Sequence, residues 1–179
     1  RTGHALRVES FAGLDKPLVF VHLSGSAVAL APEAENCDAI LQAWYGGQSA
    51  GDAITDILFG TYNPSGRMPL TTYKSDNDLP ALEDYSMSNR TYRYFRGEVR
   101  YPFGYGLSYT TFKYEACPSD TVVATGKSLA YQVKVTNTGS KDGDEVVQLY
   151  ISHSKQKQTE RMPLCALKGF QRVSLKKGE

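Results

Sequence analysis

The sequence predicts an α/β layer over residues 1–108, part of a mostly parallel α/β sandwich, followed by an incomplete all-β sandwich over residues 109–179. Two observations indicate the α/β layer. A nearly continuous apolar run at Leu18–Leu23 is typical of a strand in a parallel sheet, and residues 48–60 carry one apolar helical face. From about Thr110 onward, apolar and polar side chains alternate with a period of two, which indicates antiparallel strands.

The N-terminal residues are expected to form the end of a helix and then a buried strand. Residues 1–14 have apolar side chains at helical spacing, as in an amphipathic helix. The run at Leu18–Leu23 is partly β-branched and closes at Ser24-Gly25-Ser26. We therefore expect a strand that is buried on both faces, in a sheet covered by helices.

Two more helices are predicted after this strand. Asp38 would begin the first, with Trp44 on its apolar side and Gly46-Gly47 at its end. Residues 48–60 would form the second, because their apolar side chains share one face and Gly60 provides the stop.

The following region is rich in turn signals and aromatic residues. Residues 63–66 (Asn-Pro-Ser-Gly) predict a turn, and residues 68–73 predict a short strand. Residues 75–89 are polar and predict a loop, whereas residues 91–95 predict another short strand. Residues 100–112 contain a dense group of aromatic side chains with two glycines and no carboxylate, which is typical of neither a helix nor a solvated loop.

The C-terminal region predicts antiparallel strands. Residues 128–136 alternate cleanly, residues 137–143 predict a turn, and residues 145–151 alternate again. Residues 167–175 are a third candidate strand. A sandwich of this type needs roughly seven strands, and one buried strand is not a sheet. We therefore expect the natural polypeptide to continue beyond both ends of the sequence.

Composition excludes several classes of partner and site. With 20 basic and 19 acidic residues there is no positive excess to favour nucleic acid. The longest apolar run, Leu18–Val21, is far too short for a membrane helix. The three cysteines form no CxxC pair, and no cluster of metal ligands is visible, so we expect no metal site. Whether Cys117 and Cys165 pair in an exported protein stays open.

Several stretches in a consistent order resemble the C-terminal portion of glycoside hydrolase family 3, the β-glucosidase and β-xylosidase family. They are KPLVFVHLSGSAVAL, AILQAWYGGQSAGDAITDILFGTYNPSGRMPLT, LPALEDYSMSNRTYRYF, YPFGYGLSYTTF, and VKVTNTGSKDGDEVVQLYI with LKGFQRVSL. Together they cover most of residues 16–176. One such stretch would be weak evidence, but five in order are strong evidence.

The resemblance implies an architecture. Residues 1–108 would be the second half of the family's C-terminal α/β domain, and residues 109–179 the first part of a fibronectin type III-like, immunoglobulin-like sandwich. Residues 100–112 would then be the seam between the two, where aromatic rings bury large areas. The alternative for the same aromatic segment is a platform on which sugars stack.

The resemblance also implies a function. Family members are retaining exo-β-glycosidases that release terminal β-linked xylose or glucose from oligosaccharides without a cofactor, using two carboxyl groups. The family's nucleophile lies on an N-terminal barrel, and its acid/base glutamate lies in a loop before the segment that begins at Lys16. The fifteen residues before Lys16 match no such loop, because Glu9 lies in the predicted helix. We therefore assign no catalytic residue to this chain. The family suggests a periplasmic or secreted protein, and the sequence itself leaves compartment and oligomeric state open.

Three residues are candidates for substrate binding, each with a simpler explanation. Trp44 at a predicted helix end could face a sugar pocket, or it could belong to the core. Glu83 and Asp84 could bind sugar hydroxyls from their loop, or they could be solvated.

Two other functions compete with the glycosidase. One is a non-catalytic carbohydrate-binding or scaffold module built from the same two layers. The other is a nucleotide binder of flavodoxin type, suggested by the glycines in residues 46–51. No lysine follows these glycines at the phosphate-loop position, and no strand is expected directly before them, which argues against nucleotide binding.

Overall fold

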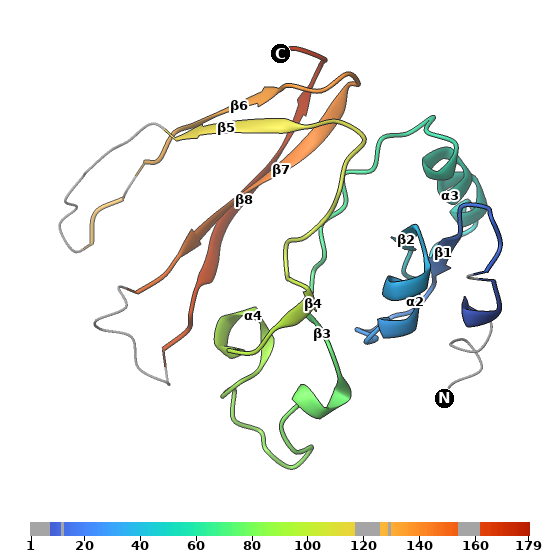
Figure 1. Ribbon diagram of the computed structural model, residues 1–179. Coiled ribbons are helices and arrows are strands. Elements are labelled where there is room, and N and C mark those ends of the chain that lie inside the picture. The colour runs from blue at the N-terminus through green and yellow to red at the C-terminus, as the bar shows by residue number, and fades with distance from the viewer. Residues whose placement is uncertain (1–7, 12, 117–125, 129, 154–161) are drawn as a thin grey trace.

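The computed structural model describes residues 8–11, 13–116, 126–128, 130–153 and 162–179. Among these residues helices and strands are mixed, and the sheets are small, each with two strands. Figure 1 shows the N-terminal α/β elements on one side, the long C-terminal strands on the other, and a loop-rich middle region between them.

The N-terminal region is a β-α-β unit followed by a helix. Strand β1 (Val19–His22) pairs in parallel with β2 (Ala39–Gln42), and α2 (Ala31–Asn36) connects them. The strand predicted at 18–23 and its parallel pairing are therefore confirmed. Its predicted burial on both faces is wrong for the described chain, since Val19 is 42% exposed and β1 has a single neighbouring strand.

The helix predicted to begin at Asp38 is wrong. Residues Ala39–Gln42 form β2, and the helix lies earlier, with Pro32 in its first turn. Asp38 instead anchors the start of the strand pair, because its Oδ2 accepts a hydrogen bond from the backbone N–H of Leu18 at 2.7 Å. A four-residue apolar run does not distinguish helix from strand, and pairing with β1 decides the outcome.

The helix predicted at 48–60 is confirmed as α3 (Ala50–Leu58). Gly60 follows it with φ of +75°, the left-handed conformation typical of a glycine after a helix end. At the N-terminus, residues 8–11 are helical, as predicted, and the rest of that predicted helix up to residue 7 lies outside the described residues.

The middle region contains a short antiparallel pair of β3 (Thr72–Tyr73) and β4 (Val99–Tyr101). The strand predicted at 68–73 is thus confirmed over its last two residues. Between the pair lie a 3-10 turn, η1 (Asp76–Asp78), and one turn of helix, α4 (Thr91–Tyr94).

The strand predicted at 91–95 is wrong, because this segment forms α4. Thr91 has φ of +56°, which is rare for a β-branched residue, and its N–H donates to the Tyr73 hydroxyl at 2.8 Å. Asn89 also has positive φ, at +54°. These two positions turn the chain into α4 in a way that alternation of side chains does not reveal.

The described part of the C-terminal region contains two antiparallel pairs. Strand β5 (Phe112–Ala116) pairs with β6 (Val133–Asn137), and β7 (Gly143–Ile151) pairs with β8 (Ala166–Leu175). The three predicted C-terminal strands are confirmed, although β6 begins later than expected. Leu129, predicted to lie in it, is outside the described residues.

The pairing of β7 with β8 contains a bulge. Leu149 lies opposite Gly169, whereas Tyr150 lies opposite Leu167, so Lys168 is one extra residue in β8. The N–H of Leu167, at this irregularity, donates to the hydroxyl of Tyr92 at 3.1 Å.

A polar hub lies near the end of β6. Asn137 is fully buried, with 0% exposure. Its Oδ1 accepts hydrogen bonds from Thr110 Oγ1 at 2.7 Å and Gly139 N at 3.1 Å. Its Nδ2 donates to the carbonyl oxygens of Lys141 at 2.8 Å and Leu175 at 3.2 Å. One side chain therefore joins the entry to β5, the turn after β6 and the end of β8.

Candidate functional site

The carboxyl ends of β1 and β2 lie side by side. His22 Nδ1 is 2.8 Å from Gln42 Oε1, and Gln42 Nε2 is 3.5 Å from Ser24 Oγ. In sheets with parallel strands, ligands bind outside the carboxyl ends. This polar edge is therefore the first candidate for a binding surface.

Trp44 follows directly after this edge in a strained conformation. Its φ is +56°, and such a conformation costs of the order of 1–3 kcal/mol for a bulky residue. Tyr45 beside it is 79% exposed, and a Cβ on Gly25 would come within 2.6 Å of the Tyr45 ring. The structure thus places the half-buried Trp44 on a tight loop at the edge of the sheet, not on the helix that was expected.

Glu83 and Asp84 lie elsewhere, on an exposed loop. Hydrogen bonds that Ser86 donates to the carboxylate, first from its side chain and then from its backbone N–H, hold the pKa of the Asp84 carboxyl below its usual value. Arg90 fixes the loop by donating to the carbonyl oxygens of Ala81 at 3.1 Å and Asp84 at 2.7 Å. Among the described residues, no hydrogen bond or ring contact joins this loop to Trp44, so the structure does not bring the three candidates together.

The connection between β2 and α3 differs from the expectation that no strand comes directly before residues 46–51. A strand does precede this glycine-containing loop, since β2 ends at Gln42 and α3 begins at Ala50. The lysine of a phosphate loop is still missing, and the acidic Asp52 occupies the first turn of α3.

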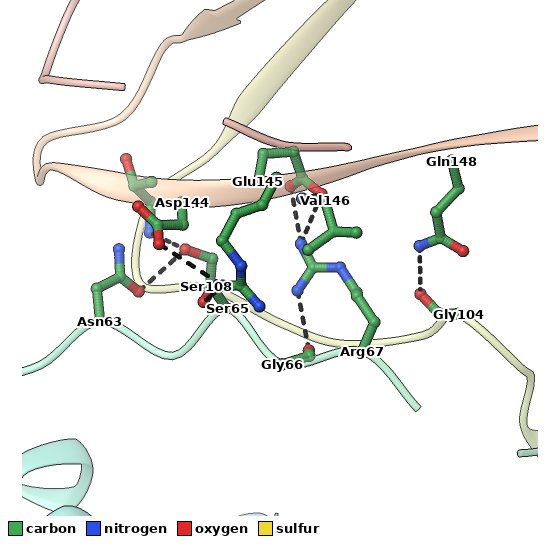
Figure 2. A network of polar contacts seen from close by, with 12 residues as sticks. Asn63, Ser65, Gly66, Arg67, Gly104, Ser108, Asp144, Glu145, Val146 and Gln148 are labelled. Atoms are coloured by element: carbon green, nitrogen blue, oxygen red, sulfur yellow. Dashed lines mark hydrogen bonds and ion pairs between the residues drawn. The ribbon is translucent and has the colours of Figure 1, made fainter. Parts of the chain in front are cut away.

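Sequence reasoning missed a buried ion pair between the loop after α3 and β7. Arg67 Nη2 donates to both carboxylate oxygens of Glu145, at 2.7 and 2.8 Å, while Arg67 Nη1 donates to the Gly66 carbonyl at 3.0 Å. The two side chains are 12% and 10% exposed. Figure 2 shows the Arg67 side chain reaching from the loop to Glu145 on β7. The turn-rich context of Arg67 does suggest a loop-fixing role for its guanidinium, but it does not identify Glu145 as the partner.

Glu145 is therefore a poor candidate for a nucleophile, because both its oxygens are bound by a guanidinium. Its charge also acts on Tyr114. Burial first, and then the negative charge and hydrogen bond of Glu145, raise the pKa of Tyr114 to about 12, against the opposing effect of Arg67. The cluster is arranged to hold elements together rather than to transfer protons near neutral pH.

A second cluster lies next to this ion pair and was also missed. Asn63 Oδ1 accepts from Ser108 Oγ at 3.0 Å and from Tyr109 N at 2.8 Å, and Asn63 Nδ2 donates to the Asp142 carbonyl at 2.9 Å. The Tyr109 hydroxyl donates to the Ile57 carbonyl in α3 at 2.7 Å. The end of the aromatic segment thus contacts α3 as well as the loop and the turn before β7.

The rings of the aromatic segment extend this network. Phe103 stacks on Tyr92 with ring centroids 4.2 Å apart, and Tyr150 of β7 meets both rings edge-on at 6.5 and 6.1 Å. Gln148 Nε2 donates to the Gly104 carbonyl at 3.1 Å, and Gln148 Oε1 accepts from the Tyr150 hydroxyl at 2.6 Å. Residues 100–112 therefore pack against α4 and β7.

A cavity of about 710 Å³ opens between these elements. Its walls come from the Arg67–Thr71 loop, α4, the segment from Pro102 to Gly106, and β7. Among the described residues, no group of three or more histidines, cysteines, aspartates or glutamates could hold a metal ion. Cys37 and Cys165 carry free thiols, and Cys117 lies outside the described residues.

Comparison with known proteins identifies the family. Residues 3–109 match the family described as Glycosyl hydrolase family 3 C-terminal domain. The chain belongs to glycoside hydrolase family 3.

Family 3 relatives match along nearly the whole chain. A xylan 1,4-beta-xylosidase from Xylanibacter ruminicola is 52% identical over 165 residues, which cover 92% of this chain and 18% of that protein. A periplasmic beta-glucosidase from Salmonella typhimurium is 40% identical over 179 residues, covering 92% of this chain and 23% of that protein. The chain thus spans about a fifth of the length of these family 3 relatives.

Solved family 3 structures agree in fold. The beta-glucosidase from Kluyveromyces marxianus in complex with glucose has a TM-score of 0.85 and 35% identity, covering 99% of this chain and 22% of that one. The family 3 beta-glucosidase from Bifidobacterium adolescentis has a TM-score of 0.83 and 35% identity, over 98% and 27% of the two chains.

The helices in the described part of this chain are all too short or too polar to span a bilayer.

Proposed function

We propose that this chain works within a retaining exo-β-glycosidase that releases terminal β-linked xylose or glucose from oligosaccharides. The observation that carries the proposal is the 52% identity to a protein named xylan 1,4-beta-xylosidase, over 92% of this chain. Because the chain spans about a fifth of that relative, the activity belongs to a longer protein in this proposal.

The chain contributes no catalytic residue in this proposal. Retaining hydrolysis needs two carboxyl groups about 5–5.5 Å apart, one acting as nucleophile and one as acid and base. Glu145 is neutralised by Arg67, and Glu83 and Asp84 lie on an exposed loop. The nucleophile would come from a barrel domain and the acid/base from another loop of the α/β domain, both outside these 179 residues.

The contribution of this chain is one wall of the sugar pocket. Trp44 supports this role because a bulky residue held at positive φ, at the carboxyl edge of parallel strands, is typical of a site where geometry serves a ligand. Its indole would stack on a sugar ring, while Glu83 and Asp84 would contribute hydroxyl contacts at the rim.

The domain division in this proposal falls near residue 108. Residues 1–108 would be the second half of the family's α/β domain, and residues 109–179 the first part of a fibronectin type III-like sandwich. The change from a parallel pair to antiparallel pairs supports the division. The Arg67–Glu145 and Asn63–Asp142 contacts would brace the two parts against each other.

We place the whole enzyme in the periplasm or outside the cell. The support is the relative from Salmonella typhimurium, which is named periplasmic. Cell fractionation with an antibody against this chain tests the placement.

Hydrolysis by the complete gene product that contains this chain tests the function. We expect release of nitrophenol from nitrophenyl β-xyloside and β-glucoside, with the product sugar retaining its anomeric configuration when followed by NMR. The α-linked substrates serve as controls. Hydrolysis with inversion, or none with either β-linked substrate, contradicts the proposal. Binding of xylobiose without hydrolysis would instead favour the alternative, a non-catalytic carbohydrate-binding or scaffold module.

A further inference from the structure

The conformation of Trp44 requires support from its surroundings. A bulky residue at φ of +56° is strained, and such a conformation persists only where neighbouring contacts favour it over relaxed alternatives. Residues 45–49, which follow Trp44, are exposed and bury little around it. The chain before Trp44, where β2 ends at Gln42, is therefore the place to look for this support.

The last residues of β1 and β2 form a hydrogen-bonded pair just before Trp44. His22 and Gln42 are register partners in the parallel pair, and His22 Nδ1 lies 2.8 Å from Gln42 Oε1. An amide oxygen can only accept, so Nδ1 carries the hydrogen and donates it. One residue further on, the Ala43 N–H donates to the His22 carbonyl at 2.9 Å. These two bonds fix the backbone from which the strained residue departs.

The same pair is connected to the loop after β1. Gln42 Nε2 contacts Ser24 Oγ at 3.5 Å, and Ser24 Oγ donates to the Ser26 carbonyl at 3.0 Å. The His22 ring is itself placed by stacking on Phe20, with ring centroids 5.7 Å apart and planes inclined by 24°. The imidazole and the amide thus connect both strand ends at the edge where Trp44 lies.

We propose that His22 and Gln42 are positioning residues for substrate binding, because their hydrogen bond holds the Trp44 loop in the conformation that receives a sugar. This inference rests on the proposed function, in which the Trp44 indole stacks on a sugar ring. Without the bond, part of the population would relax to other loop conformations. The apparent dissociation constant would then rise in inverse proportion to the fraction that stays competent. Because the bound state itself is unchanged, KM should rise and kcat should not.

Two substitutions of His22 in the complete gene product separate the hydrogen bond from the ring. His22→Phe keeps a ring to stack on Phe20 but removes the donor, whereas His22→Asn removes the ring and keeps an N–H donor near the Nδ1 position. We expect His22→Phe to raise KM for nitrophenyl β-xyloside about 2- to 10-fold, the value of one hydrogen bond, at unchanged kcat. His22→Asn should restore KM to that of the unmodified protein. His153→Phe, at an exposed histidine after β7, is the matched control and should leave KM unchanged.

A double-mutant cycle tests whether the pair acts through Trp44. In Trp44→Gly no indole remains to be positioned, so adding His22→Phe should not raise KM further. A further rise by the same factor would overturn the inference, because His22 would then act by another route. An unchanged KM for His22→Phe would also overturn it. So would equal rises for His22→Phe and His22→Asn, which would assign the effect to the ring.

Amide hydrogen exchange supplies a readout that does not depend on activity. Peptides covering residues 43–49 should exchange faster in His22→Phe than in His22→Asn or the unmodified protein, while peptides from β7 exchange at an unchanged rate. Hydrolysis together with unchanged exchange in residues 43–49 refutes the positioning role alone. Faster exchange in His22→Phe, with no hydrolysis by the unmodified protein, refutes the proposed glycosidase alone, because the pair would still be shown to hold the Trp44 loop.

Discussion

Arg67 and Glu145 are 78 residues apart in the sequence, yet one guanidinium nitrogen lies within 2.8 Å of both carboxylate oxygens. The orientation of the guanidinium is fixed, because Nη2 donates to both carboxylate oxygens while Nη1 donates to the Gly66 carbonyl. The pair connects the loop after α3 to the first residues of β7. The contact of Asn63 with the Asp142 carbonyl reinforces the same connection. So does the contact of Gln148 with the Gly104 carbonyl (Figure 2).

Breaking this ion pair from one side should destabilise the protein. Glu145→Gln leaves a mostly buried guanidinium without its counter-charge, and we expect a loss of about 3 kcal/mol in the free energy of unfolding by denaturant titration. Glu98→Gln is the control, because the pair of Glu98 with Lys74 is exposed and should matter little. The double variant Arg67→Met/Glu145→Leu should recover most of the loss. Equal stability of Glu145→Gln and the unmodified protein would contradict this view.

Tyr114 should make stability fall at alkaline pH. Its pKa is raised from 10.0 to about 12, mainly by burial and then by Glu145. A group with a higher pKa in the folded state stabilises the fold fully below pH 10, and its contribution is lost as the pH rises from 10 to about 12. Denaturant titrations across this range should show a smaller loss for Tyr114→Phe. Part of the loss should persist, because burial also raises the pKa of Tyr101 and Tyr150. An identical pH profile for the variant would argue against the prediction.

Asn137 should be among the residues most sensitive to substitution. Asn137→Ala removes four side-chain hydrogen bonds in a fully buried place and leaves their partners unsatisfied. We expect a loss of about 2–4 kcal/mol in thermal or denaturant unfolding. Asn36→Ala removes one bond, to the Pro32 carbonyl, from a less buried side chain, and should cost less than about 1 kcal/mol. Similar losses for the two variants would show that Asn137 is not a hub.

Gly104 should not tolerate a side chain. Its φ is +81°, and a Cβ would lie 2.3 Å from Gln148 Oε1 and 2.7 Å from the Tyr150 hydroxyl. Gly104→Ala should cost about 1–2 kcal/mol from the backbone conformation alone, and more from displacing Gln148. Gly47→Ala, where the added Cβ meets nothing within 4 Å, should be nearly neutral in melting temperature. Equal melting temperatures for the two variants would show that the close approach at Gly104 does not affect stability.

Substitution of Trp44 distinguishes a substrate-binding role of this residue from a packing role. Trp44→Gly relieves the positive φ but removes the indole. If Trp44 binds sugar, KM for nitrophenyl xyloside should rise about tenfold or more while the melting temperature changes little. Tyr45→Ala, at the 79% exposed neighbouring position, should leave the melting temperature unchanged and serves as the control. A large fall in melting temperature with unchanged KM would instead assign Trp44 to packing.

Local periodicity explains which elements the sequence could predict. Strand β1, helix α3 and strands β7 and β8 each carry a pattern that is complete within about ten residues. Strand β2 has four residues, too few to separate a helix from a strand, and its identity depends on pairing with β1.

The site depended on contacts that no local pattern contains. The Arg67–Glu145 pair joins residues far apart in the sequence, and its sequence context shows only a turn and an alternating strand. The sequence predicts Trp44 on a helix that begins at Asp38, whereas this segment forms strand β2 and a loop. The place of Trp44 at the strand edge could therefore not be derived from the sequence. The density of rings in residues 100–112 did indicate unusual packing, but not their partners in α4 and β7.

The bulge at Lys168 lies next to the backbone donor that contacts the aromatic stack. With one residue too many in β8, the amide of Leu167 points to Tyr92, whose ring supports Phe103. Deleting Lys168 would restore an uninterrupted ladder and change the local geometry that presents this amide to Tyr92. Helix α4 would keep a second attachment, because the Leu164 N–H donates to the Arg93 carbonyl at 2.6 Å, so strand length at this point governs the support of one ring rather than the placement of the whole loop.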